Sequence, residues 1–287
     1  MSGSRAESLI QDHWSDAAVF GDEDRVPSGE RRRAGAVIRP RLSIDNVALR
    51  NLRRLNLAMT SIRVGVSSTS LDVWYVDLDV SAGALSCFGP WLSDDELARA
   101  ARFRWDLERA RFMVGRAALR CALADRLGCS PAAIRLSYGT NGKPMLEGGR
   151  GHVEFNLAHS GGDAVIALAD RAAIGVDIEL LRPIADVESL ARLVFSDVER
   201  GELELAPDRV SAFLNGWTRK EAYVKALGLG LSAPLTEITV SLSGRAALFS
   251  TGLPDQSVSN WRLLNVPHPR AVVALALGPR LDRTRAT

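Results

Sequence analysis

Lysine is nearly absent from this sequence. Of its 36 lysine and arginine residues, only three are lysine, namely Lys143, Lys220 and Lys225. This bias indicates that arginine replaces lysine wherever either cation serves, so the three retained lysines mark positions where a guanidinium does not serve. An ammonium is a compact charge with three donors, whereas a guanidinium is a flat fork. These three positions are therefore the first candidates for a functional role.

Cysteine is also scarce, and long apolar runs are missing. The cysteines, Cys87, Cys121 and Cys129, match neither a metal-ligand spacing nor a disulfide framework, which favours a reducing compartment. No apolar stretch approaches the length of a membrane span, and the N-terminus lacks the pattern of a secretion signal. We therefore expect a cytoplasmic protein without a membrane partner.

The balance of charge is close to neutral. A formal net charge of +2 does not demand a nucleic-acid partner, although clustered arginines could still bind a phosphorylated small molecule. With 46% hydrophobic and 24% charged residues, the composition is typical of a soluble globular protein. The 287 residues allow one large domain or two of ordinary size.

The N-terminal part differs from the rest of the chain. Residues 1–68 include the polar stretch "GDEDRVPSGERRRAGAVIRPR" and are predicted to form a largely disordered extension. Its arginine run could bind an acidic partner, but a solvated tail is the simpler interpretation. Met59 is a candidate start of the compact protein. The first strong strand pattern, "LDVWYVDLDV", begins at residue 71.

A pattern of helix followed by strands occurs twice. Segments 109–128 and 210–228 share a phenylalanine, a glycine three residues later, a basic run and a Leu-Gly end. A distant duplication explains this repeat, and chance is the alternative. We predict an α+β fold of two similar halves, related by a pseudo-twofold axis around a central cleft. The halves would be residues 69–172 and 173–279, with a C-terminal tail at 280–287.

Two carboxylates alternate along one predicted strand. In "GVDIEL", Val176 and Ile178 point to one face, and Asp177 and Glu179 point to the other. A solvated strand face is the ordinary interpretation. The neighbouring apolar strands indicate an internal sheet instead, where adjacent carboxylates repel unless a cation lies between them. Because Mg²⁺ prefers oxygen ligands, this pair is a candidate metal site, with Glu221 as a third ligand.

The helix "WTRKEAYVKALG" carries charges beside its apolar stripe. Glu221 and Lys225 border the stripe that contains Trp217, and Lys220 lies inside it. An exposed i, i+4 pair and a lysine that snorkels to water would explain these positions without function. We expect instead that the helix faces the cleft, where Lys225 reaches an anion held by the metal. The role of Lys220 stays open between structure and ligand.

Further cations suit a phosphorylated substrate. Lys143 lies in the tight turn "TNGKP", and His159 ends a strand beside a glycine turn, although a lone histidine is more often structural. Arg99, Arg102 and Arg111 lie on the first long helices and could bind further phosphates. A divalent metal surrounded by several cations indicates a pyrophosphate-like substrate.

Five segments together resemble a known family. In order, "RFRWDLERARFMVGRAALR", "TNGKPML", "FNLAHSGG", "GVDIE" and "WTRKEAYVKALGLGL" resemble the motifs of Sfp-type 4′-phosphopantetheinyl transferases, over about residues 70–277. These enzymes move the phosphopantetheine arm of coenzyme A to a serine of a carrier protein and release 3′,5′-ADP. The resemblance implies the same fold and activity here, with Mg²⁺ as cofactor.

The resemblance also implies a set of site residues. Mg²⁺ would be held by Asp177, Glu179 and Glu221, and Glu221 is either the general base or only a ligand. Lys225 would lie at the pyrophosphate and complete the catalytic pair with Glu221. Ala158 stands where the family often has serine, which removes one hydroxyl contact. The implied contacts of coenzyme A are Arg99, Asn141, Gly142, Lys143, Asn156, His159 and Lys225.

The implied partners are acyl, peptidyl or polyketide carrier domains, which would place a monomeric protein in secondary metabolite biosynthesis.

Two other functions use the same residues. A catalytically inactive homologue could bind coenzyme A or a carrier as a regulator, although the intact acid trio argues against it. A metal nuclease uses similar carboxylates, but the near-neutral net charge does not favour nucleic-acid binding.

Overall fold

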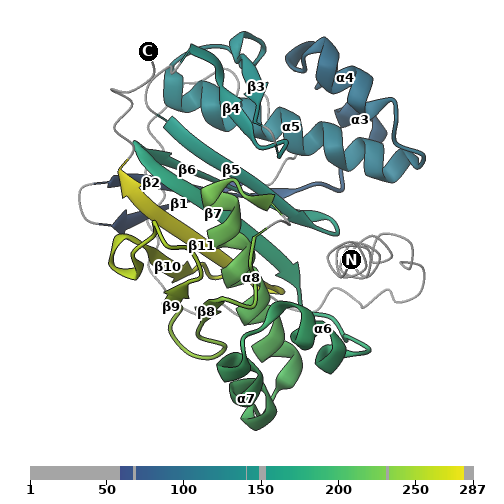
Figure 1. Cartoon of the computed structure of the whole chain (residues 1–287). Coiled ribbons are helices and arrows are strands. Elements are labelled where there is room, and N and C mark those ends of the chain that lie inside the picture. Colours follow the sequence, from purple (N-terminus) through teal and green to yellow (C-terminus); the bar gives the residue numbers. More distant parts are fainter. Residues whose placement is uncertain (1–58, 67–68, 140, 149–152, 231–232, 281–287) are drawn as a thin grey trace. The chain divides into compact units, whose positions relative to one another are not determined.

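The computed structural model describes residues 59–66, 69–139, 141–148, 153–230 and 233–280, which form an α+β fold (Figure 1). This confirms the predicted fold class. The described helices are α3 (Ala82–Leu85), α4 (Asp94–Ala100), α5 (Asp106–Leu127), α6 (Val187–Val194), α7 (Asp197–Leu205) and α8 (Arg209–Leu227), with short 3-10 turns at Gly89–Trp91, Pro131–Ala133 and Val258–Asn260.

An antiparallel sheet of four strands has the order β1-β2-β6-β5. The first two strands pair from Met59 opposite Val76 to Val66 opposite Thr69. The boundary predicted after residue 68 is therefore wrong by one strand, because β1 pairs with β2 and belongs to the fold. Residues 1–58 of the predicted extension lie outside the described residues. The strands are β1 (Met59–Val66), β2 (Thr69–Asp77), β5 (Val153–Ser160) and β6 (Asp163–Asp170).

A second antiparallel sheet has the order β10-β11-β7. Along β7, the apolar residues Ile174, Val176 and Ile178 are buried in a core shared with β2 and β6 of the first sheet. The alternation of "AIGVDIEL" thus turns one face of β7 toward this core, as predicted. The strands are β7 (Ala172–Leu180), β10 (Arg262–Asn265) and β11 (Ala271–Arg280), and residues 281–287 of the predicted tail lie outside the described residues.

Two small hairpins complete the strands. The first pairs β3 (Leu136–Tyr138) with β4 (Pro144–Leu146), and its turn contains Gly142 at a φ of 74°. A positive φ favours glycine, so the tight turn predicted in "TNGKP" is confirmed, and it closes a hairpin. The second pairs β8 (Ile238–Val240) with β9 (Leu248–Thr251).

The long helices begin and end where the sequence signals them. The Ser93 side chain and Glu96 form a capping box at the start of α4, and Gly128 ends α5 in the left-handed conformation. In α8, Asp208 caps the first turn and Gly228 ends the last. The packing of α5 buries Val114, Leu119 and other residues against the first sheet.

Helix-on-sheet packing therefore occurs twice, with α5 on the first sheet and α8 against β7 and β11 of the second (Figure 1). This arrangement is consistent with two related halves, and the pseudo-twofold axis stays a prediction. The boundary expected after residue 172 falls at the start of β7. Among the described residues, no helix combines the length and apolar character needed to cross a membrane.

Candidate active site

Gly175 sets the distance between β7 and α8. A β-carbon at this position would overlap the carbonyl oxygen of Ala222 and the amide nitrogen of Ala226, both on α8. Only a residue without a side chain lets helix and strand backbones approach so closely. Because strand side chains alternate, Asp177 and Glu179 project from the same face as Gly175, toward α8.

Lys225 joins the strand to the helix. Its Nζ atom donates to Asp177 Oδ1 at 2.5 Å and lies 3.9 Å from Glu221 Oε2. The Asp177 side chain is 7% exposed and Glu221 13%, whereas Lys225 is 31% exposed. The structure thus brings these three predicted residues into one corner, where Lys225 has the most exposed side chain.

The charges in this corner strongly perturb one another. Burial raises the pKa of Glu179 to about 8, and the neighbouring Asp177 carboxylate adds to the rise. Burial likewise raises the pKa of Glu221 to about 7, although Lys225 opposes it. Burial alone would lower the pKa of Lys225, but Asp177 and Glu221 raise it above its usual value. Three carboxylates with one ammonium leave an excess of negative charge in a poorly solvated place.

Two hydrogen bonds orient the carboxylate of Glu179. Ser160 Oγ donates to Glu179 Oε2 at 3.1 Å, and Trp217 Nε1 donates to Oε1 at 3.3 Å. Ser160 Oγ also accepts from the Leu180 amide at 3.2 Å, which ties β5 to the edge of β7. Sequence reasoning missed the role of Ser160. The only signal was its place between His159 and the glycine turn.

The predicted coenzyme A contacts on the first hairpin meet the end of α8. Lys143 Nζ donates to the carbonyls of Ile174, Lys225 and Ala226, at 3.2, 2.7 and 3.3 Å. The side-chain amide of Asn141 donates to the Gly228 carbonyl at 2.8 Å. Apart from the Ile174 carbonyl on β7, the acceptors belong to the C-terminal end of α8, where a helix leaves carbonyls without partners in the helix. Their contact with coenzyme A stays a prediction.

Asn156 and His159 lie on β5 with different surroundings. Asn156 is buried, and its Oδ1 accepts from the Val176 amide at 2.8 Å, so it fastens β5 to β7. His159 is exposed to solvent, yet desolvation by the neighbouring protein lowers its pKa, and the charges of Lys225 and Arg111 lower it further. His159 therefore lies close enough to two of the predicted cations, Lys225 and Arg111, to feel their charge.

Lys220 is structural. Its ammonium is fully buried and donates to Glu199 Oε2 at 2.6 Å and to the carbonyls of Val194 and Leu235 at 2.7 Å each. All three donors of the ammonium are therefore used by α7 and its neighbours. The question that the sequence left open is resolved, because this side chain points away from Asp177 and Lys225.

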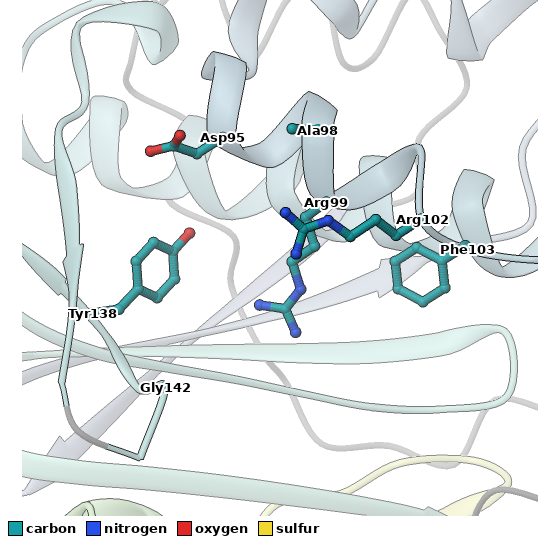
Figure 2. Close-up of a pocket in the computed structure, with 7 residues that line it drawn as sticks. All are labelled: Asp95, Ala98, Arg99, Arg102, Phe103, Tyr138 and Gly142. Atoms are coloured by element: carbon teal, nitrogen blue, oxygen red, sulfur yellow. The ribbon is translucent and has the colours of Figure 1, made fainter.

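A pocket of about 590 Å³ lies between α4 and the first hairpin (Figure 2). Two predicted residues, Arg99 and Gly142, line it, together with Arg102. Within the described part of the chain, neither guanidinium forms an ion pair with a carboxylate, so both can accept an anionic ligand. Sequence reasoning missed the other lining residues, which are Asp95, Ala98, Phe103 and Tyr138.

Arg111 is engaged differently from the other two arginines. Its guanidinium pairs with Asp79, with Nε 2.7 Å from Oδ1 and Nη2 3.1 Å from Oδ2. The Asp79 carboxylate in turn fills the space where a side chain at residue 162 would lie. Arg111 therefore supports the glycine turn after His159 and does not line the pocket.

The suitability of the corner for a divalent cation can be judged from its donors. No three His, Cys, Asp or Glu side chains converge to metal-binding separation in the described residues. The donors are nevertheless suitable for Mg²⁺. Asp177 Oδ2 is buried without a hydrogen-bond partner, and burial together with the charge of Asp177 raises the pKa values of Glu179 and Glu221. A divalent cation would supply what this donor set lacks.

Comparison with known proteins adds independent information. A family model described as the 4′-phosphopantetheinyl transferase superfamily matches residues 173–276. A second, described as the N-terminal part of 4′-phosphopantetheinyl transferase, matches residues 81–171. The two matches together cover the whole candidate site, and β1 and β2 of the first sheet lie before them.

Three curated proteins illustrate the similarity. The 4′-phosphopantetheinyl transferase HetI of Nostoc is 38% identical over 73% of this chain and 88% of its own length. A Synechocystis protein described as a putative 4′-phosphopantetheinyl transferase is 35% identical over 61% of this chain and 72% of its own. The 4′-phosphopantetheinyl transferase of Bacillus subtilis is 32% identical over 63% of this chain and 80% of its own.

Proposed function

The chain belongs to the 4′-phosphopantetheinyl transferase family, and from this premise we propose how its own residues carry out the transfer. It moves the phosphopantetheine arm of coenzyme A to a serine of a carrier protein and converts the carrier from the apo to the holo form. The observation that carries the residue assignment is the corner of Asp177, Glu179, Glu221 and Lys225, where one ammonium faces three carboxylates.

The metal proposal rests on the same corner. Asp177, Glu179 and Glu221 would hold Mg²⁺, with Ser160 and Trp217 keeping the Glu179 carboxylate in a fixed orientation. When bound, Mg²⁺ would offset the negative charge that builds on the pyrophosphate during transfer.

The transfer then needs a base and a cation beside the reacting phosphorus. The carrier serine Oγ forms a bond to the β-phosphorus, the bond from that phosphorus to the oxygen of 3′,5′-ADP breaks, and 3′,5′-ADP leaves. Glu221 takes the serine proton, directly or through water, because its carboxylate lies in the same corner as Lys225 and Asp177. Lys225 stabilises the charge on the leaving pyrophosphate oxygen, because its ammonium lies beside the carboxylates that would hold Mg²⁺.

The nucleotide end of coenzyme A would occupy the pocket beside α4. Arg99 and Arg102 supply two guanidiniums without carboxylate partners among the described residues, which suits phosphate. Lys143 and Asn141 connect the hairpin of this pocket to the end of α8, close to Lys225. Coenzyme A bound along this path would extend from the pocket to the corner.

A transfer assay tests the proposal. The full chain is incubated with labelled coenzyme A and a panel of apo acyl, peptidyl and polyketide carriers, with Mg²⁺ or with excess EDTA. We expect label on at least one carrier with Mg²⁺ and none with EDTA. Full turnover in EDTA would contradict the metal proposal. Coenzyme A binding without transfer to any carrier would favour the inactive, regulatory alternative.

Two variants test the corner itself. Asp177→Asn should lower the rate by orders of magnitude while circular dichroism stays unchanged, because it removes a metal ligand and the partner of Lys225. Asp197→Asn is a matched control, because this acid lies in the exposed first turn of α7 and pairs with Arg200 at the surface. We further propose a monomeric, cytoplasmic enzyme, which size-exclusion chromatography and cell fractionation would examine.

A further inference from the structure

Beneath the pocket lies a buried group of three charges. Arg116 Nε is 2.8 Å from Glu96 Oε1, and Arg120 Nε is 2.6 Å from Glu96 Oε2. All three side chains are at least nine-tenths buried. Although burial alone raises the pKa of Glu96, the Ser93 amide and the two guanidiniums hold it below its usual value. Two guanidiniums and one carboxylate leave one positive charge in excess.

One member of this group reaches the pocket wall. Arg116 Nη2 donates to the Tyr138 hydroxyl at 2.7 Å, and its Cζ atom lies 5.7 Å from the centroid of the ring. Tyr138 is nevertheless 42% exposed, because it lines the pocket. The buried guanidinium of Arg116, which is bonded to Glu96, therefore holds the exposed ring of Tyr138 in a fixed position.

The two sides of the pocket carry different kinds of side chain. Figure 2 shows Asp95 and Tyr138 on one side, and the guanidiniums of Arg99 and Arg102 beyond them toward Phe103. A ligand that fits this division has a flat ring with a hydrogen-bond donor at one end and a phosphate at the other. The exposed ring supplies a stacking surface, and the carboxylate supplies an acceptor.

Building on the proposed function, we propose that Tyr138 and Asp95 select the base at the nucleotide end of coenzyme A. The Tyr138 ring packs against the purine, and Asp95 accepts a hydrogen bond from the exocyclic amino group of adenine. Arg116 is a positioning residue, which acts through the hydroxyl of Tyr138 and does not touch the ligand. Guanine is disfavoured, because its O6 atom would meet the Asp95 carboxylate.

Binding of two bisphosphates by calorimetry tests this inference. Adenosine 3′,5′-bisphosphate and guanosine 3′,5′-bisphosphate carry the same phosphates and differ in the base. We expect the wild-type chain to prefer adenosine, and Asp95→Asn to reduce that preference. Asp94→Asn is the matched control, because Asp94 is an exposed acid of the same helix turn that does not line the pocket.

Removal of the ring tests the stacking surface. Tyr138→Leu should weaken the binding of both bisphosphates roughly ten- to a hundred-fold, which is the effect expected when one base–aromatic stack is lost. The same variant should raise KM for coenzyme A by a similar factor, with the rate recovering at saturating coenzyme A. Met145→Leu, an exposed apolar residue of the same hairpin outside the pocket, should leave both values unchanged.

A double-mutant cycle tests the positioning role. Tyr138→Phe removes only the hydroxyl, and Arg116→Lys keeps the charge but loses the donor to that hydroxyl. If Arg116 acts through Tyr138, each change raises the dissociation constant a few-fold, and the double variant binds no more weakly than the worse single variant. Fully additive losses would overturn the positioning role. The Tyr138→Leu test does not depend on the stability of the Arg116 variant.

Failure of this inference can be told from failure of the proposed function. In one outcome, the wild-type chain binds the bisphosphates and transfers label, and Tyr138→Leu binds the bisphosphates with unchanged affinity. This outcome would overturn the role of Tyr138 and leave the transferase function in place. Equal affinity of the wild-type chain for the two bisphosphates would overturn the role of Asp95. A wild-type chain that neither binds adenosine 3′,5′-bisphosphate nor transfers label would overturn both.

Discussion

At the scale of single residues, the pKa values of the site carboxylates depend on two effects, which are their burial and the charges of neighbouring groups. Glu179 and Glu221 have raised pKa values in the fold, whereas in an unfolded chain they would titrate near the ordinary value of 4.5. The folded state therefore binds these protons more tightly. Without metal, the stability that protonated Glu179 and Glu221 contribute to the fold is lost as the pH rises from about 4.5 to about 8.

The first prediction follows from this sign. Because Mg²⁺ binds the deprotonated carboxylates, its stabilising effect should grow as the pH rises. We expect the increase in Tm on adding Mg²⁺ to be larger at about pH 8.5 than at about pH 6, measured by calorimetry against EDTA samples. Glu179→Gln should weaken the pH dependence. An identical increase in Tm at every pH would contradict the assignment of these ligands.

The second prediction concerns Lys225. A guanidinium cannot replace a compact ammonium that donates to Asp177 at 2.5 Å and lies 3.9 Å from Glu221. Lys225→Arg should therefore lower kcat about a hundred- to a thousand-fold, as is common when one stabilising donor is lost. The affinity for coenzyme A should change less, because the charge accumulates on the pyrophosphate in the transition state.

Steady-state kinetics check this second prediction. Arg135→Lys, an exchange in the opposite direction at an exposed position, is the control and should leave kcat unchanged. If Lys225→Arg kept near-normal turnover, both the assigned role and the inference from lysine scarcity would fail.

Sequence reasoning located the corner but not the groups that support it. Glu221 and Lys225 lie within one helix, so their common face follows from the helical period alone. Ser160 contacts Glu179 across 19 residues, and Arg116 contacts Tyr138 across 22, so only the folded chain shows these bonds. The arginines of "GRAALR" look like a solvated helix face in the sequence, whereas Glu96 makes their burial possible.

At the scale of elements, β7 and α8 form one unit because Gly175 lets them touch. The third prediction is that Gly175→Ala lowers the free energy of unfolding by about 1–3 kcal/mol or more, because the methyl group must push the two backbones apart. Transfer activity should fall as well, since Asp177 and Lys225 project from the separated elements.

Denaturant unfolding and the transfer assay measure both effects. Gly201→Ala is the matched control, because Gly201 lies inside α7 and a β-carbon there meets nothing within 4 Å. That change should be neutral or stabilise by about 0.4–1 kcal/mol. Equal effects of the two substitutions would show that the close approach at Gly175 is not required.

Most elements could be predicted from the sequence, because periodicity and end signals agree locally. The strands β5, β6 and β7 lie where the apolar runs and glycine turns place them, and Ser93 and Gly128 are ordinary end signals for the helices that they bound. The strand β1 was missed, because "MTSIRVGV" follows a polar, arginine-rich segment and its pairing depends on β2. Local composition cannot reveal a partner strand that comes later in the chain.

At the scale of the whole molecule, β1 is an edge strand whose partner β2 lies next to the core. The fourth prediction compares two truncated chains. A chain of residues 59–287 should remain soluble and active, because it keeps β1 and every site residue. A chain of residues 69–287 should have a lower Tm and aggregate more, because the edge of β2 loses its partner.

Thermal unfolding, light scattering and the transfer assay compare the two truncated chains with the full chain. Loss of folding or activity in the 59–287 chain would show that the preceding residues are part of the domain. Equal behaviour of the two truncated chains would show that β1 adds nothing to stability.

The placement of the three lysines has a practical consequence for chemical labelling. Lys220 is fully buried, Lys143 donates to three carbonyls, and Lys225 is 31% exposed at the substrate corner. An acylating reagent attacks the neutral amine, and both Lys143 and Lys225 are half-buried. Burial lowers the pKa of Lys143, whereas Asp177 and Glu221 raise the pKa of Lys225, so Lys143 is the more reactive of the two. Mass spectrometry of the peptide that contains Lys143 would then report occupancy of the site, because bound coenzyme A would shield this lysine from the reagent.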